Sequence, residues 1–74
     1  MNKQRRERIA EAIDLLNQAR DILDECKSEE EDYLDNMPEN LQQGEKGDAA
    51  QSAIDSLESA IDSIDDAISS AEEI

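Results

Sequence analysis

The chain has 74 residues and a formal net charge of −14, with one cysteine, no histidine and one aromatic residue. A chain of this length forms a single domain, 1–74, and usually needs disulfides, a metal or self-association to be stable. Cys26 alone excludes an internal disulfide, and the lack of histidine argues against zinc, so we expect no metal, no cofactor and a homo-oligomer. The acidic charge argues against direct binding of nucleic acid or membrane and favours a basic protein partner.

Residues 3–35 are predicted to form the first helix, because apolar residues recur along them at heptad spacing. With Ile9 placed at heptad position a, large residues follow at a and small residues follow at d. Position a holds Ile9, Leu16 and Leu23, d holds Ala12, Ala19 and Cys26, and g holds Leu15 and Ile22. This stripe is wider than one neighbouring helix can cover, which predicts more than one contact for this helix.

Residues 36–47 are predicted to form a capped turn with a short helix. Pro38 ends the first helix, because proline disfavours helical geometry in the residue before it. Asn36 and Glu39 have the spacing of a capping box, with Pro38 inside the first turn. This predicts one or two helical turns that stop at Gly44.

Residues 48–73 are predicted to form the second long helix, which begins with a capping box of Asp48 and Gln51. A strict period of seven is typical of a helix packed along a seam. The repeating units are Ala53–Ser59, Ala60–Asp66 and Ala67–Glu73. Alanine at position d lets two backbones approach closely. The predicted seam, within the hairpin or between copies, consists of Ala12, Leu16, Ala19, Leu23, Ala53, Leu57, Ala60, Ile64 and Ala67.

The sequence therefore predicts an all-α fold, an antiparallel two-helix hairpin with small residues at a coiled-coil-like seam. Antiparallel order brings the basic N-terminal turn beside the acidic C-terminal turn, where unfavourable helix-dipole charges become favourable neighbours. One hairpin contact leaves two apolar edges uncovered, which are Ile54, Ile61 and Ile68 on one helix and Leu15 and Ile22 on the other. We expect two hairpins to join in a four-helix bundle, or more of them to form a higher oligomer.

No set of residues favours catalysis, so we expect the protein not to be an enzyme. Acid–base chemistry near neutral pH commonly needs histidine or a buried carboxylate, and the serines have no neighbouring base. Cys26, between apolar turns, is expected to be buried and unreactive. The one basic cluster consists of Lys3, Arg5, Arg6 and Arg8. It is interpreted either as pairing with acidic neighbours or as contacting a phosphate group.

The segment 37–47 reads Met-Pro-Glu-Asn-Leu-Gln-Gln-Gly-Glu-Lys-Gly and runs into the Ala-Ile-Asp-Ser repeat. Over residues 29–74 the chain resembles a group of small acidic helical proteins from phages and prophages of Gram-positive bacteria. That group shares a Pro-Glu-(Asn/Ser)-Leu-Gln turn followed by an Ala-(Ile/Val)-Asp-x-Leu-Glu helix. The resemblance implies a phage context, in which small acidic proteins often block host enzymes; this step is an analogy.

The charge and the resemblance together predict a phage-encoded acidic interaction protein in the cytoplasm of the host bacterium. It would bind and block a basic nucleic-acid-handling or defence protein as a DNA mimic. The predicted partner-binding face consists of Asp55, Glu58, Asp62, Asp65 and Asp66. One alternative is an oligomeric sponge that holds a phosphorylated signalling nucleotide through the N-terminal basic cluster. Another is a purely structural oligomerisation module.

Overall fold

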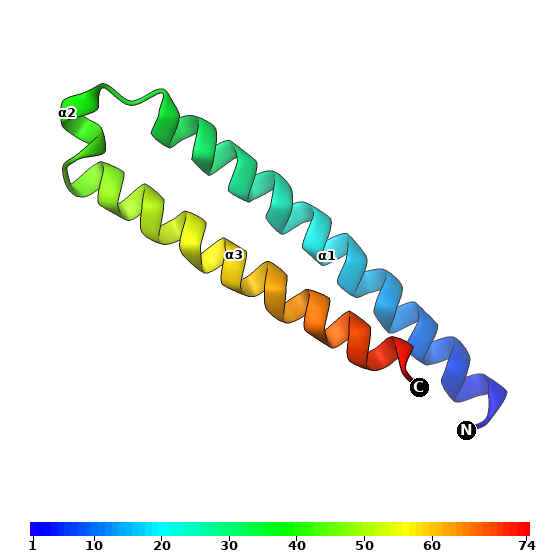
Figure 1. Cartoon of the computed structure of the whole chain (residues 1–74). Coiled ribbons are helices and arrows are strands. Elements are labelled where there is room, and N and C mark those ends of the chain that lie inside the picture. Colours follow the sequence, from blue (N-terminus) through cyan, green and yellow to red (C-terminus); the bar gives the residue numbers. More distant parts are fainter.

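The computed structural model describes residues 1–74 as a hairpin of two long helices joined by one short helix (Figure 1). The helices are α1 (Lys3–Asp35), α2 (Glu39–Gln42) and α3 (Glu45–Glu72). α1 and α3 pack against each other in antiparallel order, and both termini lie at the end opposite α2. The molecule is a rod of 58 × 15 × 12 Å. The predicted all-α hairpin is confirmed.

α1 has the bounds that its heptad pattern predicts, and both of its ends are capped. At the N-terminus the Asn2 side chain accepts a hydrogen bond from the main-chain N–H of Arg5 at 2.8 Å. This satisfies one of the donors that a helix N-terminus leaves free. At the other end Asn36 is the C-cap, and its main-chain N–H donates to the carbonyl of Asp32 at 3.0 Å.

The connection contains the predicted short helix, which ends before Gly44, but this helix is not capped as predicted. Pro38 is the N-cap of α2 with an extended backbone (ψ 145°), and no side chain caps this helix. The predicted capping box of Asn36 and Glu39 is therefore wrong, because Asn36 belongs to the end of α1. The side-chain amide of Gln42 instead donates to the carbonyls of Leu34, at 3.0 Å, and Met37, at 3.1 Å.

α3 begins at Glu45, three residues before the predicted start, with Gly44 as its N-cap. The predicted capping box of Asp48 and Gln51 is wrong, since Asp48 already lies inside the helix. Gly47 is buried in the first turn, where an added Cβ would overlap the main-chain carbonyl of Gln42. The glycine allows this close approach of two backbones and does not mark a corner of the chain.

The seam between α1 and α3 follows heptad positions a and e, and not a and d. On α1 it runs through Ile9, Ile13, Leu16, Arg20, Leu23, Lys27, Glu30, Leu34 and Met37. On α3 it runs through Gly47, Ala50, Ile54, Leu57, Ile61, Ile64, Ile68 and Ala71. The most buried apolar side chains are those of Ala50, Ile54 and Ile68.

The predicted alanine seam is therefore wrong within the hairpin. Position d lies at the border of the contact or outside it: Ala53 and Ala60 are half-buried, and Ala12, Ala19 and Ala67 are exposed. The isoleucines at e, expected at an uncovered edge, form the core instead. Burying isoleucine removes more apolar surface from water than burying alanine, so the helix rotates to cover e. The expected exposure of Leu15 and Ile22 is confirmed, at 57% and 60%.

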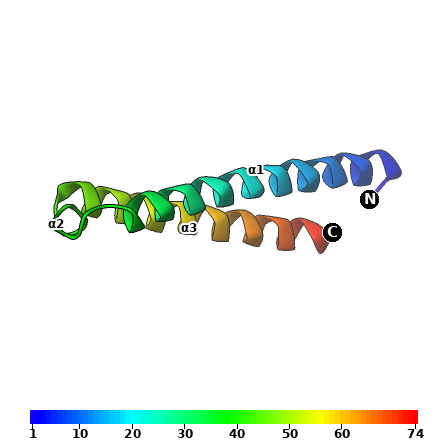
Figure 2. The same ribbon diagram turned by 90° about the horizontal axis from the view of Figure 1, so that it is seen from above.

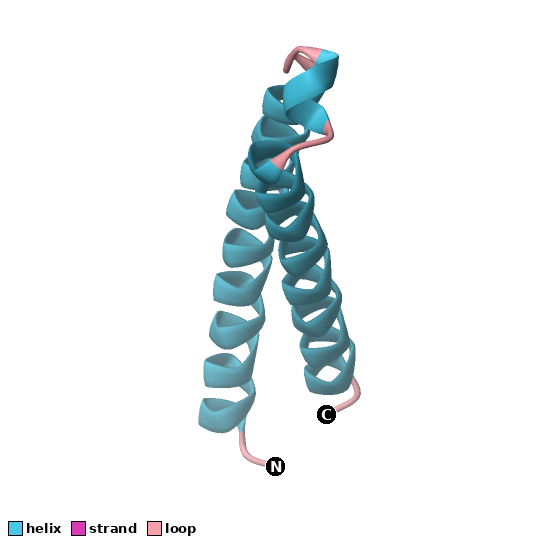
Figure 3. Ribbon diagram, turned by 90° about the vertical axis from the view of Figure 1, so that its left-hand side faces the viewer, coloured by secondary structure: helices cyan, strands magenta, loops and turns pink.

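The two long helices cross at a shallow angle: they overlap at the α2 end and part toward the chain termini in Figures 2 and 3, while the gap between them narrows toward the termini in Figure 1. At the end that carries the termini, Ile9 and Ile13 of α1 and Ile74 after α3 border the cavity described below.

Candidate functional site

Two ion pairs cross the seam in its polar middle. Arg20 Nη1 lies 3.1 Å from Asp65 Oδ1, and Lys27 Nζ lies 3.1 Å from Glu58 Oε1. The two basic residues are seven residues apart on α1, and the two acidic residues are seven residues apart on α3. One alignment of the two helices therefore forms both pairs. A slip of less than a heptad along the helices would break the two pairs together, so they oppose such a slip and favour this antiparallel register. Each hydrogen bond raises the pKa of its basic partner, through Asp65 for Arg20 and through Glu58 for Lys27.

These pairs divide the predicted acidic face. Glu58 and Asp65 sit at heptad position b, beside the seam, and bind the basic residues of α1. Asp55, Asp62 and Asp66 are exposed and make no ion pair within 4 Å. Asp55 accepts one hydrogen bond, from the Gln51 amide at 3.0 Å. The structure thus leaves three of the five predicted residues free to meet another molecule.

The three free aspartates lie on the outer side of α3. Asp55 and Asp62 are one heptad apart and share a helix face, with a rise of about 10.5 Å between them. Asp66 is four residues after Asp62, so these two carboxylates are neighbours on the surface at a rise of about 6 Å. The outer side of α3 carries no basic residue from Asp48 to Glu73, so nothing on this helix neutralises them.

The N-terminal basic cluster does not form one site. All four of its side chains are exposed, and none makes an ion pair within 4 Å. Arg6 occupies heptad position e, on the seam side, whereas Arg5 and Arg8 occupy d and g on an outer side. Consecutive side chains on a helix point in different directions, and this separates Arg6 from its neighbours.

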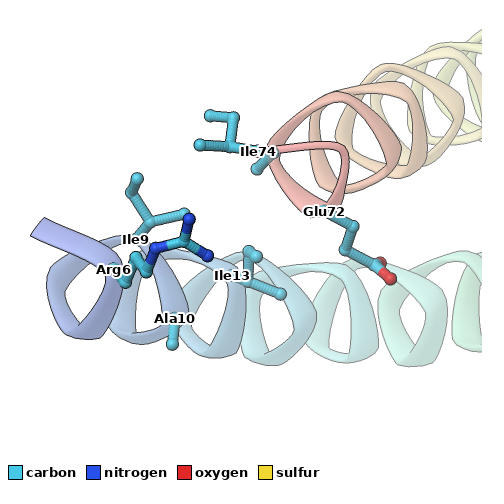
Figure 4. A pocket seen from close by; sticks show the side chains of 7 residues that line it. Arg6, Ile9, Ala10, Ile13, Glu72 and Ile74 are labelled. Carbon is cyan, nitrogen blue, oxygen red and sulfur yellow. The ribbon is translucent and has the colours of Figure 1, made fainter. Parts of the chain in front are cut away.

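Arg6 borders an open, shallow cavity of about 310 Å³ at the ends of α1 and α3 that carry the chain termini (Figure 4). Its lining residues are Arg6, Ile9, Ala10, Ile13, Ala71, Glu72 and Ile74. The predicted proximity of the basic N-terminal turn and the acidic C-terminal turn is confirmed by this shared cavity. Arg6 and Glu72 nevertheless form no ion pair, and in Figure 4 the Glu72 side chain points away from Arg6.

Cys26 is exposed, so the expectation of a buried thiol is wrong. The error has the same origin as that of the alanine seam, because position d lies outside the contact between the helices. Sequence reasoning also missed the seam roles of Arg20 and Lys27. The available signal was their spacing of seven residues, matched by the spacing of Glu58 and Asp65 on the other helix.

Comparison with known proteins finds no family model, no curated protein and no solved structure that matches this chain. None of the helices has a stretch both long and apolar enough to cross a membrane. No cluster of three potential metal ligands occurs in the structure. Electrostatic complementarity is therefore the property of this surface on which a functional argument can rest.

Proposed function

We propose that this protein is a non-enzymatic acidic interaction protein that occupies the nucleic-acid-binding surface of a basic protein. The observation that carries the proposal is the row of free aspartates on α3, Asp55, Asp62 and Asp66, on a helix side without any base. Proteins that handle nucleic acid present clustered lysine and arginine, which bind phosphate mainly through charge. The carboxylates along this rod offer such a surface the same negative charge that nucleic-acid phosphates carry.

The charge density of the rod supports this proposal. The chain carries 21 acidic residues along 58 Å, or about one carboxylate per 3 Å of length. Duplex DNA carries one phosphate per ~1.7 Å of axis. One hairpin thus presents somewhat more than half the linear charge of a duplex before its own basic residues are subtracted. Action as a DNA mimic in a phage-infected cell is the specific form of the proposal, and it derives from the resemblance described above.

The test compares proteins retained from a bacterial lysate by the wild-type chain and by an Asp55→Asn/Asp62→Asn/Asp66→Asn variant. We expect the wild type to retain basic proteins that a 30-base-pair duplex releases, and the variant to lose most of them. A matched control, Glu11→Gln/Glu25→Gln/Asp32→Asn, removes the same charge from α1 and should keep the binding. Retention that ignores both the duplex and the α3 aspartates would refute the proposal.

The nucleotide sponge is the second candidate, and the cavity beside Arg6 is the observation that favours it. Two features oppose it. Glu72 borders the same cavity and repels phosphate, and Arg5 and Arg8 lie on another side of α1. An Arg5→Ala/Arg6→Ala/Arg8→Ala variant separates the candidates. It should retain the basic proteins at wild-type level, whereas a sponge would lose any nucleotide that copurifies with the wild type.

A further inference from the structure

One long side of the hairpin is uncharged over its middle part, and nothing in the monomer covers it. On α1 the exposed residues at positions d and g run from Ala12 to Cys26 without an acid. They are Ala12, Leu15, Ala19, Ile22 and Cys26. Between residues 53 and 70 of α3 the same positions hold only alanine and serine, which are Ala53, Ser56, Ala60, Ser63, Ala67 and Ser70. We call these two stripes together the uncharged side.

The two stripes share one side because the helices are antiparallel. In such a pair, equivalent heptad positions of the two helices project to the same side of their common plane. The ion pairs support this geometry, since Glu58 and Asp65 at position b of α3 reach α1 on the opposite side. Asp55 and Asp62, at position f, therefore lie away from the uncharged side, and Asp66, at position c, lies at its border.

The α1 stripe has charged ends of opposite sign. It begins with Arg5 and Arg8 at positions d and g, and after Cys26 it continues with Glu29 and then Tyr33, all exposed. The stripe from Arg5 to Tyr33 is about 42 Å long, from a rise of ~1.5 Å per residue. A basic end, an apolar middle and an acidic end with an aromatic ring form a pattern that is complementary to its own reverse.

We propose that a second copy of this chain docks on the uncharged side, with the two α1 helices packed antiparallel. Large residues then meet small ones across the contact: Leu15 of one copy lies opposite Cys26 of the other, and Ile22 lies opposite Ala19. Arg8 comes beside Tyr33 of the second copy and within about one helical turn of Glu29. The two-fold axis repeats every contact, so each favourable pair forms twice.

Other occupants fit less well. A parallel second copy would place Arg8 on Arg8 and Glu29 on Glu29, and like charges repel. Packing α1 on α3 of the second copy would set Leu15 and Ile22 against serine hydroxyls and remove those from water. A basic unlike protein would gain little from the apolar middle, since the free aspartates lie elsewhere. The dimer does not depend on the proposed function and can be tested without it.

Sedimentation at about 10 and 500 μM tests whether a second copy docks on the uncharged side. A tenfold change in dimer affinity corresponds to about 1.4 kcal/mol. The wild type should sediment as a dimer. A Leu15→Glu/Ile22→Glu variant should be monomeric with its helical circular dichroism retained, because both side chains are already exposed in the hairpin. The control, Ser52→Glu/Ser59→Glu, adds the same charge to exposed positions off this side and should remain dimeric.

Charge exchange tests the same contact without removing apolar residues. Arg8→Glu and Glu29→Arg should each weaken dimerisation by about tenfold or more, and the double variant should restore it. A monomeric wild type at both concentrations would overturn the proposal, and so would a double variant that is no better than the single ones.

Mild oxidation tests the orientation. In the antiparallel dimer the two Cys26 residues are about 16 Å apart along the axis, too far for a disulfide, whose Cα atoms lie within ~7 Å. The wild type should therefore not cross-link, whereas Leu15→Cys should form a covalent dimer through the native Cys26 of the second copy. Ser59→Cys, at an exposed position off the contact, is the matched control and should not cross-link. Efficient cross-linking of the wild type would show parallel helices and overturn the proposal.

Discussion

Gly47 controls how closely the end of the short helix approaches the first turn of α3. Its missing side chain leaves room for the main-chain carbonyl of Gln42, and no small shift of a flexible group could make that room for a methyl. Glycine inside a helix ordinarily costs about 0.5–1 kcal/mol relative to alanine. The packing requirement therefore outweighs helix propensity at this position.

We predict that Gly47→Ala destabilises the hairpin, although alanine is the better helix former. The expected loss is about 1–3 kcal/mol, the usual cost of forcing added methyl groups into a packed site. Thermal unfolding followed by circular dichroism measures it. Ser52→Ala, at an exposed position of the same helix, is the control and should raise the melting temperature slightly. Equal or higher stability of Gly47→Ala would mean that the approach of the two backbones is not tight.

The Lys27–Glu58 pair is expected to make the stability of the hairpin decrease at alkaline pH. The hydrogen bond from Glu58 raises the pKa of Lys27 in the folded state above its ordinary value. For a raised pKa, the stabilisation is fully present below the unfolded-state pKa of about 10.4 and is lost as pH rises through the folded-state pKa. We predict that the melting temperature falls more steeply above about pH 10 in the wild type than in Lys27→Met. Lys46→Met changes an exposed lysine that makes no ion pair, and its melting temperature should follow that of the wild type. If the melting temperature of the wild type falls no more steeply than that of Lys27→Met, this role of the pair is contradicted.

At the scale of the elements, the heptad period predicted which segments are helical but not which face of each is covered. The bounds of α1 followed from its pattern, and the antiparallel order followed from the turn and the charges. The choice between covering d and covering e depends on how the stripes of two helices match, and a single-helix pattern does not contain that information. Isoleucine at e of α3 decided it, together with the ion pairs that Arg20 and Lys27 make from position e of α1.

The same lack of information about the second helix explains why the candidate site was predicted only in part. Five acids were predicted as one face from their outer heptad positions, and the structure assigns two of them, Glu58 and Asp65, to register. Their role could not be read from α3 alone, because their partners lie more than thirty residues away in the sequence. The start of α3 was misplaced for a related reason: Asp48 and Gln51 were interpreted by local capping chemistry, whereas the first turn of α3 begins earlier and contains the contact of Gly47 with α2.

The orientation of α3, with heptad position e facing α1, predicts which apolar side chains contribute most to the stability of the hairpin. Ile54 is 5% exposed in the seam, so Ile54→Ala should destabilise the hairpin by about 2–4 kcal/mol through lost burial and a cavity. Leu41 is 41% exposed, and Leu41→Ala should cost less than about 1 kcal/mol. Urea unfolding of the two variants measures the difference. Similar losses would mean that the seam does not run along a and e.

The side-chain hydrogen bonds of Gln42 are expected to stabilise the C-terminal end of α1. Its amide satisfies the carbonyls of Leu34 and Met37 near the end of that helix. Gln42→Leu removes both bonds, and each net hydrogen bond contributes about 0.5–1.5 kcal/mol, so a loss of about 1–3 kcal/mol is expected. Hydrogen exchange should quicken at the last turn of α1 before it changes at the centre. The exposed neighbour gives the control variant Gln43→Leu; protection equal to wild type in Gln42→Leu would exclude this capping role.

For the whole molecule, repulsion between carboxylates opposes the folded rod. The chain has a net charge of −14, and its three ion pairs involve only two basic residues, Arg20 and Lys27. Such an excess of one sign destabilises the compact state by self-repulsion. Salt screens both effects, since the Debye length falls from about 10 Å at 0.1 M to about 3 Å at 1 M. Repulsion is the larger of the two, because many more acids repel than pair.

We therefore predict that the melting temperature of the hairpin rises between about 0.1 and 1 M sodium chloride, although salt weakens the Arg20 and Lys27 pairs. An Asp55→Asn/Asp62→Asn/Asp66→Asn variant has three fewer unpaired carboxylates on α3, so it should start from a higher melting temperature and gain less from salt. The comparison separates screening from general salting-out, which would raise both proteins equally. A melting temperature that falls with salt in the wild type would mean that the few ion pairs outweigh the repulsion, and that the register they select is also the main source of stability.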